Sequence, residues 1–208
     1  MIVDRSRLSI TSLRLAPLLL GAVLVSDIDG QRVAVRLTEV EAYAGADDPA
    51  SHAFRGSTPR TAVMFGPAGH LYCYFTYGMH WCANVVCGAE GIASAVLLRA
   101  GEIIDGAEVA ATRRPAARAP RDLARGPARL ASALALNRAT DGVDLCATDS
   151  PVRLVSMPSR RARQVETGPR VGINVAIERP WRFWLPGEPS VSAFKPGRPA
   201  RRGTANPL

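Results

Sequence analysis

The sequence has almost no lysine, few aromatic residues and no segment that resembles a membrane span. Lys195 is the only lysine among 26 basic residues, a bias toward arginine that a GC-rich genome produces without a functional cause. The apolar stretch at residues 18–25 is too short to cross a bilayer and lacks the layout of a signal peptide. We therefore expect a cytoplasmic protein with no membrane association.

The cysteines lack the spacing of a metal or redox site. Cys73, Cys82, Cys87 and Cys146 include no C-x-x-C pair, so we expect buried free thiols, without a metal or a disulfide. The composition, with 47% hydrophobic and 21% charged residues, excludes wholesale disorder and collagen-like order. A chain of 208 residues is long enough for one core and too short for two large domains.

Positive charge and one concentrated group of rings are what the sequence does contain. The 26 basic residues exceed the 18 acidic ones, and the resulting net charge of +8 favours a polyanionic partner. All four tyrosines and all three histidines fall between positions 43 and 80. Because the rest of the chain has neither residue, we expect the chemistry in this segment.

Apolar spacing and turn residues predict a single mixed α/β domain over residues 1–208. Helices are predicted at 9–20, 102–112 and 126–136, and strands at 22–26, 32–43, 93–100, 152–155, 172–177 and 181–185. Residues 71–86 are predicted to form two strands joined at Tyr77-Gly78-Met79. The stretch 113–121 is predicted to be exposed, and residues 156–167 and 196–208 to be mobile.

Two acidic residues fall on the apolar face of the predicted strand 32–43. Alternation places Glu39 and Glu41 on the same face as the valines and the leucine that precede them. Burying a carboxylate is costly unless the group is paired or used. Two interpretations of Glu41 therefore stand: a salt bridge, with Arg99 as the candidate partner, or a general base held beside a cation in a partly dry pocket.

The tyrosines add a candidate slot for a ring. Tyr72 and Tyr74 share one face of a strand, with Cys73 on the other, and Tyr43 follows Glu41 by two positions and so shares its face. An acid flanked by aromatic faces suits a flat heteroaromatic ligand. The alternative is that these tyrosines are ordinary half-buried sheet residues.

The predicted hairpin tip carries Tyr77 and Met79. A turn that exposes both side chains to water is unfavourable unless the tip inserts into something. Proteins that kink a duplex or displace a base insert such side chains between base steps. The alternative is a turn folded back onto its own core.

Two short motifs suit phosphate groups, because a hydroxyl, a guanidinium and free N–H groups can converge there. They are Thr58-Pro59-Arg60 in a loop and Gly126-Pro127-Ala128-Arg129 at a helix start. The arginines between positions 113 and 125 are predicted to form a flexible basic flank instead of a reading surface.

Taken together, these motifs resemble the 3-methyladenine (alkyladenine, methylpurine) DNA glycosylase family. The resemblance covers roughly residues 13–192, in the family's order. It rests on the strings Glu39-Val40-Glu41-Ala42-Tyr43, Ser51-His52, Thr58-Pro59-Arg60, Leu71-Tyr72, Tyr77-Gly78-Met79, Asn84, Val96-Leu97-Leu98-Arg99-Ala100, Gly126-Pro127, Pro169-Arg170-Val171-Gly172 and Arg182-Phe183.

The resemblance implies a single α/β domain around a curved antiparallel sheet, with flanking helices and a protruding hairpin. It implies a metal-free and cofactor-free monomer that acts on double-stranded DNA at the nucleoid. The implied activity is that of a monofunctional glycosylase in base excision repair: a damaged purine is flipped out of the duplex, and hydrolysis of its N-glycosidic bond leaves an abasic site.

The resemblance also implies roles for particular residues. Glu41 matches the carboxylate that deprotonates water, and Arg99 the arginine that holds it. The base pocket is formed by Tyr43, His52 and Tyr74, with Asn84 disfavouring guanine through a clash with its amino group. Tyr77, supported by Met79, fills the gap left by the flipped nucleotide, and Thr58, Arg60 and Arg129 contact phosphates. Tyr72, His70 and His80 receive no role.

Two other classes of function stay open on the sequence. A non-catalytic nucleic-acid-binding module could use the same basic surface and aromatic hairpin, and would not depend on Glu41. A small-molecule hydrolase or transferase could use the same ring slot without DNA. It would lack the steep salt dependence of a protein that binds phosphates.

Overall fold

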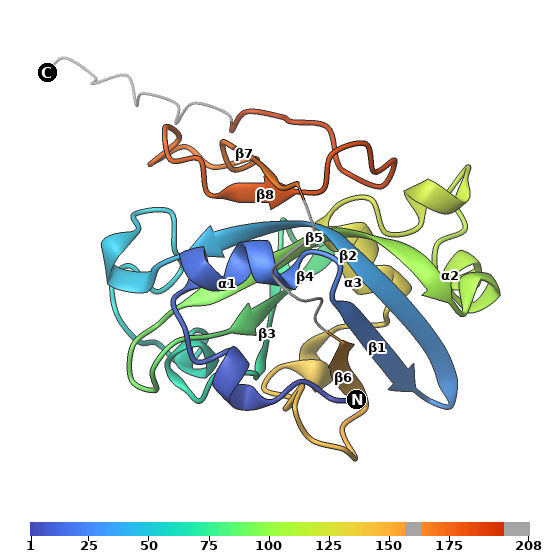
Figure 1. The fold of residues 1–208 in the computed structure, drawn as a ribbon, viewed down its shortest axis with the longest axis horizontal. Helices are drawn as coiled ribbons and strands as arrows, with labels where there is room; N and C mark the ends of the chain where they lie inside the picture. The colour runs from blue at the N-terminus through green and yellow to red at the C-terminus, as the bar shows by residue number, and fades with distance from the viewer. Residues whose placement is uncertain (157–163, 198–208) are drawn as a thin grey trace, which may run out of the picture.

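A long, curved antiparallel sheet is the centre of the computed structural model, which describes residues 1–156 and 164–197 (Figure 1). Its strands are β1 (Val23–Ile28), β2 (Gln31–Tyr43), β3 (Leu71–Thr76), β4 (His80–Val86), β5 (Ala95–Asp105), β6 (Val152–Ser156), β7 (Glu166–Gly168) and β8 (Arg182–Trp184). The order along the sheet is β3-β4-β5-β2-β1-β6. This arrangement confirms the predicted curved antiparallel sheet.

Strand β2 organises the sheet because it is long enough to take two partners along one edge. Its first half pairs with β1, and Glu39–Glu41 pair with β8, while β5 runs along the other edge. The pairing with β5 is irregular on both sides of Glu39. Such bulges bend a strand and re-aim its side chains, and here they lie next to the candidate carboxylates.

Three helices in the described part of the chain cover the sheet: α1 (Ser12–Leu19), α2 (Ala107–Arg113) and α3 (Pro127–Ala133). Helix α1 packs on β2 and β5, and α3 packs on β4 and β5. One continuous core joins them, with fully buried leucines such as Leu15, Leu98 and Leu130. Burying each of these side chains contributes about 1.5–3 kcal/mol, so the core supports the single mixed α/β fold that the sequence predicts.

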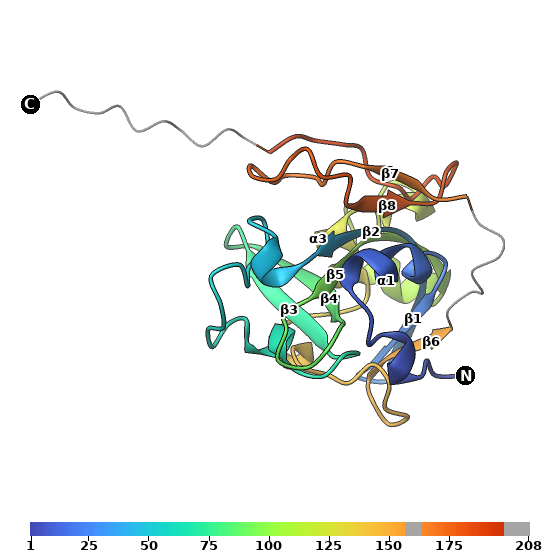
Figure 2. The ribbon, with the colours of Figure 1, turned by 60° about the vertical axis from the view of Figure 1, so that its left-hand side comes forward.

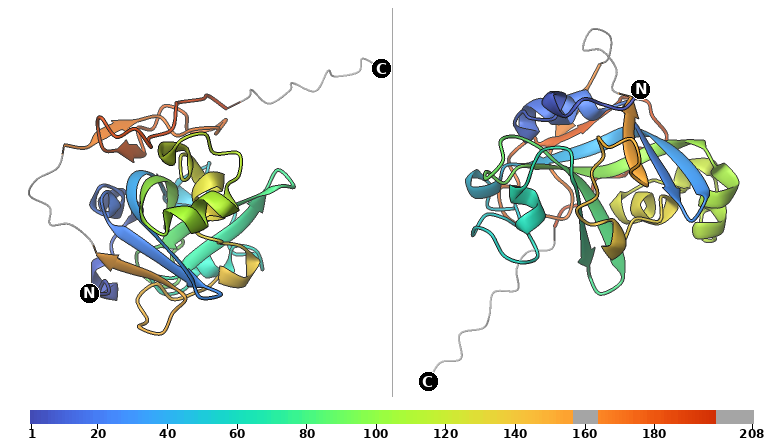
Figure 3. Two further views of the ribbon diagram at one scale, coloured as in Figure 1. Left: turned by 90° about the vertical axis from the view of Figure 1, so that its right-hand side faces the viewer. Right: turned by 90° about the horizontal axis from the view of Figure 1, so that it is seen from below.

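The turn between β3 and β4 projects from the body of the molecule, as Figure 3 shows. Tyr77 (φ +52°) and Gly78 (φ +68°) are both left-handed, and the Met79 N–H donates to the Thr76 carbonyl at 3.2 Å. Two successive left-handed residues give the turn whose twist matches a hairpin. The predicted hairpin and its tip are therefore confirmed.

The prediction of a helix over 102–112 is wrong in its first part. Strand β5 continues to Asp105. Within this added length, Glu102 forms an ion pair with Arg36 of the neighbouring strand β2 at 2.7 Å. Gly106, with φ +72°, then ends the strand, and α2 begins at Ala107. Tertiary pairing with β2 therefore overrides the local helical pattern.

The strand predicted at 172–177 is not formed. These residues adopt bends and turns, and the Gly172 N–H donates to the Lys195 carbonyl instead of to a sheet neighbour. The mobile segment predicted at 156–167 is also wrong at its ends, because Ser156 belongs to β6 and Glu166 begins β7. Residues 157–163 of that segment, and 198–208 of the tail predicted to be mobile, lie outside the described residues.

The arginine-rich stretch 113–121 is only partly the exposed flank that the sequence predicts, because most of its residues after Arg114 are exposed and the first two are not. Arg113 and Arg114 are half-buried, and Arg113 donates to the carbonyls of Ala133 and Gln31. These contacts join the end of α2 to the end of α3 and to the β1–β2 turn. The first part of this stretch is therefore a fixed part of the surface.

The segment 164–197 returns to the sheet and lies along β2, as Figure 2 shows for β7 and β8. This return places residues from the end of the chain next to Glu39 and Glu41. Cys73, Cys82 and Cys87 are buried free thiols, as predicted, whereas Cys146 is partly exposed. Within residues 1–156 and 164–197, no helix has the length and apolar character needed to span a membrane.

Candidate active site

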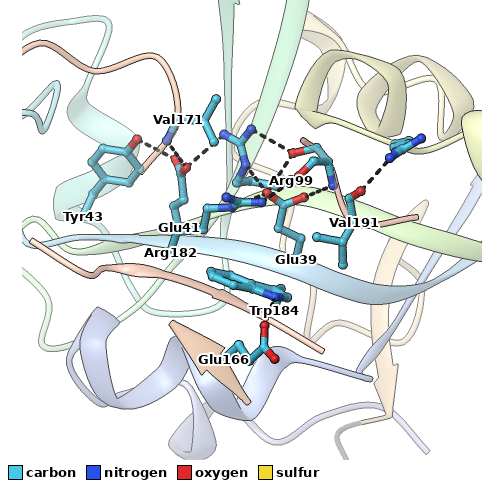
Figure 4. A network of polar contacts seen from close by, with 11 residues as sticks. Glu39, Glu41, Tyr43, Arg99, Glu166, Val171, Arg182, Trp184 and Val191 are labelled. Carbon is cyan, nitrogen blue, oxygen red and sulfur yellow. Dashed lines mark hydrogen bonds and ion pairs between the residues drawn. The ribbon is translucent and has the colours of Figure 1, made fainter. Parts of the chain in front are cut away.

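Glu41 is completely buried near the end of β2, and three donors hold its carboxylate (Figure 4). Oε1 accepts the backbone N–H of Val171 at 2.7 Å and lies 3.1 Å from Nη1 of Arg99. The hydroxyl of Tyr43 donates to Oε2 at 2.9 Å. A carboxylate has about four acceptor positions, so these three groups leave one position of Glu41 unused.

Arg99 bridges the two carboxylates of β2. Its Nη1 faces Glu41, and its Nε donates to Oε1 of Glu39 at 2.8 Å (Figure 4). Burial alone would lower the pKa of Arg99, but the charges of Glu41 and Glu39 outweigh it and raise the pKa. The predicted ion pair between Glu41 and Arg99 is thus present, and it is compatible with a catalytic use of the carboxylate.

Glu39 forms a second anchoring point, which the sequence did not assign. Its carboxylate accepts Nε of Arg182 at 2.7 Å, the Ser192 N–H at 2.7 Å and the Ser192 hydroxyl at 2.9 Å. Burial alone would raise the pKa of Glu39, but Arg99, the Ser192 N–H and Arg182 outweigh it and lower the pKa. Its place on the same apolar face as Glu41 was the only signal in the sequence.

A second buried ion pair fixes the loop that carries Val171. Arg170 donates to both carboxylate oxygens of Asp48, at 2.5 and 2.8 Å, and to the Ala42 carbonyl at 3.0 Å. Its guanidinium lies 4.6 Å from the ring centre of Tyr43 and 5.1 Å from that of Trp181. Arg170 therefore positions both Val171 and Tyr43, two of the donors to Glu41, and sequence reasoning gave it no role.

A cavity of about 230 Å³ lies in front of these groups. The base-pocket residues predicted from the sequence all line it, and so does Tyr72, which had received no role: the set is Tyr43, His52, Tyr72, Tyr74 and Asn84. Arg99 and Val171 complete the wall, with Glu41 behind them. The volume is below the range of about 300–1,000 Å³ that suits drug-sized ligands, and fits one flat heterocycle.

The rings of the cavity are held in fixed orientations. Tyr72 and Tyr74 stack with ring centres 5.6 Å apart, and His52 meets Tyr74 edge to face at 4.5 Å. The Asn84 amide donates to the Tyr72 carbonyl at 3.1 Å, which fixes its side chain. These contacts preform the cavity, so a planar ligand needs little rearrangement to enter.

The shifted pKa values of Tyr43 and His52 bear on what these two ring side chains can do. Burial, followed by the charge of Glu41, raises the pKa of Tyr43 well above its usual range, so its hydroxyl stays protonated and can donate. Burial, followed by the charge of Arg60, lowers the pKa of His52. His52 is therefore neutral at pH 7, with Nδ1 at 3.2 Å from the Tyr72 hydroxyl.

The side chains at the hairpin tip extend into solvent. Tyr77 is 81% exposed and Met79 is 67% exposed, so the turn does not fold back onto the core. Tyr77 nevertheless borders the cavity. A left-handed conformation at a tyrosine costs about 1–2 kcal/mol, and such strain is typical of functional positions.

The residues predicted to contact phosphates lie on the surface at two places. Arg60 is exposed beside the cavity, with its guanidinium 5.8 Å from the ring centre of Tyr74. Thr58 lies in the same loop and hydrogen-bonds Thr61 at 2.9 Å. Arg129 is exposed on α3. Among the described residues, no cluster of three or more His, Cys, Asp or Glu side chains could hold a metal ion.

Comparison with known proteins gives the family that the sequence resembles, and the match extends along nearly the whole chain. The family model described as methylpurine-DNA glycosylase matches residues 7–189. Relatives named "Putative 3-methyladenine DNA glycosylase" include one from Streptomyces avermitilis, 55% identical over 92% of this chain and 91% of the relative. One from Leifsonia xyli is 54% identical (93% and 92%), and one from Burkholderia lata is 50% identical (85% and 84%).

The family match covers strand β2 with both carboxylates, the ring-lined cavity, the hairpin and the returning segment as far as residue 189. The relatives cover a similar share of the chain at about half identity. The chain is therefore a member of the methylpurine-DNA glycosylase family.

Proposed function

We propose that this protein excises alkylated purines from duplex DNA by hydrolysing the N-glycosidic bond and leaving an abasic site. The observation that carries the proposal is a buried carboxylate, Glu41, held by three donors directly behind a cavity sized for one flat ring. In this proposal residues 1–208 act as one monomeric, monofunctional unit at the nucleoid in the cytoplasm. In a non-catalytic binding module, Glu41 would serve only as the ion-pair partner of Arg99.

The chemistry follows from what Glu41 can accept. Its remaining acceptor position takes a proton from a water molecule. The oxygen of that water attacks the anomeric carbon of the flipped nucleotide as the bond to the base breaks. The same negative charge stabilises the oxocarbenium character of the sugar. Arg99, Val171 and Tyr43 keep the carboxylate in place, and each does so in its protonated form.

An alkylated purine with a positive charge leaves without needing a strong acid. The electron-rich faces of Tyr43, Tyr72 and Tyr74 favour such a cationic base over a neutral one. A damaged base also stacks and pairs less well, so flipping it costs less. Asn84, fixed by its bond to Tyr72, is proposed to disfavour guanine through its exocyclic amino group.

Five exposed residues contact the DNA in the proposed mechanism. Tyr77, supported by Met79, fills the space that the flipped nucleotide leaves, which uses apolar surface that is otherwise exposed. Thr58, Arg60 and Arg129 contact phosphates, which are bound well by guanidinium and hydroxyl groups.

The test is base release from defined duplexes, each with a single lesion: 3-methyladenine, 7-methylguanine, hypoxanthine or etheno-adenine. We expect release of 3-methyladenine under single-turnover conditions. A parallel preparation of Glu41→Gln controls for contaminating glycosylases. If the wild-type protein releases none of these bases, the proposed activity is wrong.

Replacing Tyr77 with Ala should slow excision from duplex DNA by roughly 5- to 150-fold, because stacking of an aromatic ring on a base contributes about 1–3 kcal/mol. Excision from a single strand carrying the same lesion should change much less. Tyr77→Phe retains the ring and should stay close to wild type. Equal single-turnover rates for wild type and Tyr77→Ala on duplex substrate would refute the wedge role.

Release of a cationic base should fall at acidic pH, because protonated His52 would place a positive charge beside the bound cation. The pKa of His52 is lowered by burial and by Arg60, so this loss sets in below the usual histidine range. His52→Phe keeps a ring in the wall and cannot titrate. Single-turnover rates between pH 5 and 7 should therefore vary less for His52→Phe, and identical profiles would contradict the assignment.

A further inference from the structure

The projecting hairpin presents a row of side chains on the face that forms the base cavity. Side chains alternate along a strand, so His80, Cys82 and Asn84 of β4 share a face. Across the ladder, Cys82 pairs with Tyr74. Cys82 and Asn84 are buried in the cavity wall. Outward from them, His80 is exposed and pairs with Thr76, which lies at the edge of the cavity. The row therefore runs from the inside of the cavity to the hairpin tip.

The outermost pair of this row, Thr76 and His80, lies next to the wedge. Tyr77 follows Thr76 directly, and Met79 precedes His80. In the proposed function Tyr77 takes the place of the flipped base in the stack, while the cavity holds the base itself. Thr76 and His80 therefore lie between the cavity and the stacked duplex, beside the base pairs that border the gap.

The imidazole of His80 differs from the other two in its hydrogen bonding. Nδ1 of His52 lies 3.2 Å from the Tyr72 hydroxyl, and Nδ1 of His70 lies 2.9 Å from the Pro67 carbonyl. The His80 ring forms no hydrogen bond within residues 1–156 and 164–197. An imidazole carries at least one N–H donor in either protonation state. His80 therefore presents an unused donor beside the wedge.

The backbone that carries His80 is fixed on both sides. Trp81 points to the opposite face of the hairpin, where it packs against Phe75 with ring centres 5.1 Å apart. On the side of the tip, the Met79 N–H donates to the Thr76 carbonyl at 3.2 Å. The place of the imidazole relative to the wedge is therefore set by the hairpin itself.

The side from which the hairpin enters DNA indicates what His80 meets. Apolar wedges such as Tyr77 and Met79 are typical of proteins that bind DNA from the minor groove. In that groove an A·T pair offers only hydrogen-bond acceptors, adenine N3 and thymine O2, whereas a G·C pair adds the guanine amino group, which is a donor. An N–H donor of the protein matches the first pattern and is opposed by the second.

We propose that His80 is a specificity-determining residue, whose N–H donates to the minor-groove edge of a base pair next to the flipped nucleotide. It favours A·T neighbours over neighbours that carry a minor-groove amino group. This inference rests on the proposed function and deepens it. The cavity selects the base that leaves the duplex, and His80 reads a base pair that stays in it.

The experiment measures equilibrium binding to duplexes with a tetrahydrofuran abasic analogue, which leaves a gap for Tyr77 and has no base to release. In one duplex both neighbouring pairs are A·T. In the other both are 2,6-diaminopurine·T, in which an amino group is added to adenine in the minor groove. The wild-type protein should bind the A·T duplex roughly 3- to 10-fold more tightly, as expected for one hydrogen bond. His80→Phe keeps a ring without a donor and should bind both duplexes within about twofold.

Two further variants show whether the preference belongs to the donor of His80. His80→Gln restores an N–H donor and should recover part of the preference for A·T. His70→Phe is the matched control, because His70 lies outside the hairpin and is bonded to Pro67. It should keep the wild-type preference. His80 is exposed, so its variants should keep the fold, and thermal unfolding of each checks this.

Three results would overturn the proposal. The wild-type protein could show no preference, or His80→Phe could keep the full preference, which would then belong to the duplex. His80→Phe could also lose affinity for both duplexes equally and reduce the dependence on salt, which would indicate a phosphate contact.

Base release from the lesion-containing duplexes is measured separately, so the two failures can be distinguished. If bases are released and His80→Phe leaves the preference unchanged, only the role of His80 is wrong. If no base is released and His80 still separates the two abasic duplexes, the proposed activity is wrong and the reading of the minor groove stands.

Discussion

Replacing Glu41 with Gln should lower the single-turnover rate of base release by about 10²- to 10⁴-fold, the range expected for loss of a general base. Glutamine has the same shape and still offers one oxygen to the Val171 N–H, but it cannot take a proton from water. The carboxylate lies behind the cavity wall and away from the surface, so duplex affinity should stay within about twofold.

Glu39→Gln is the informative control for that result. It removes a buried negative charge that lies 2.8 Å from Nε of Arg99 in the same network. It leaves the Glu41 carboxylate, the proposed general base, unchanged. We expect Glu39→Gln to reduce stability more than rate. If it slows base release as much as Glu41→Gln does, the network acts as a whole and Glu41 is not the specific base.

Replacing Arg170 with Ala should be among the most destabilising single changes in the chain. It leaves Asp48 fully buried without its bidentate partner, and breaking a buried pair costs about 3–5 kcal/mol. For a protein of this size we expect the melting temperature to fall by roughly 6–20 °C. Base release should fall as well, because Val171 and Tyr43 lose the group that positions them.

Arg179→Ala is the matched comparison for Arg170→Ala. Arg179 contacts the same tryptophan ring as Arg170, with its guanidinium 4.6 Å from the Trp181 ring centre. It lies 3.9 Å from Asp48 and is partly exposed. Exposed pairs contribute about 0–1 kcal/mol. Calorimetry of both variants decides the matter: similar melting temperatures would show that burial of Arg170 does not carry the stability assigned to it.

Local periodicity was sufficient for the parts of the site that lie on single strands. The two-residue period placed Tyr43 on the face of Glu41, and the structure joins them at 2.9 Å. The same period placed Tyr72 and Tyr74 together, and the sequence at Tyr77-Gly78-Met79 marked the hairpin turn. These features depend on neighbours only a few positions away, so a single sequence contains their signal.

The rest of the site depends on contacts between distant segments. Nothing near Asp48 in the sequence indicates that it pairs with Arg170, and nothing near Glu39 indicates Arg182. The error at 102–112 has the same origin, because pairing of β5 with β2 decides that region. Arg113 and Arg114 were predicted to be exposed because their partial burial arises only once α2 has docked on α3.

Because residues 164–197 return to β2, the contacts of both carboxylates depend on residues far along the chain. Val171 reaches Glu41 across 130 positions, and Arg182 and Ser192 reach Glu39 across 143 and 153. Chains fold from the N-terminus during synthesis, and contacts this distant close late. The hairpin and the two arginines proposed to contact phosphates, Arg60 and Arg129, lie before residue 130. The set of donors around both carboxylates is therefore complete only once residues 171–192 have been synthesised and have docked on β2.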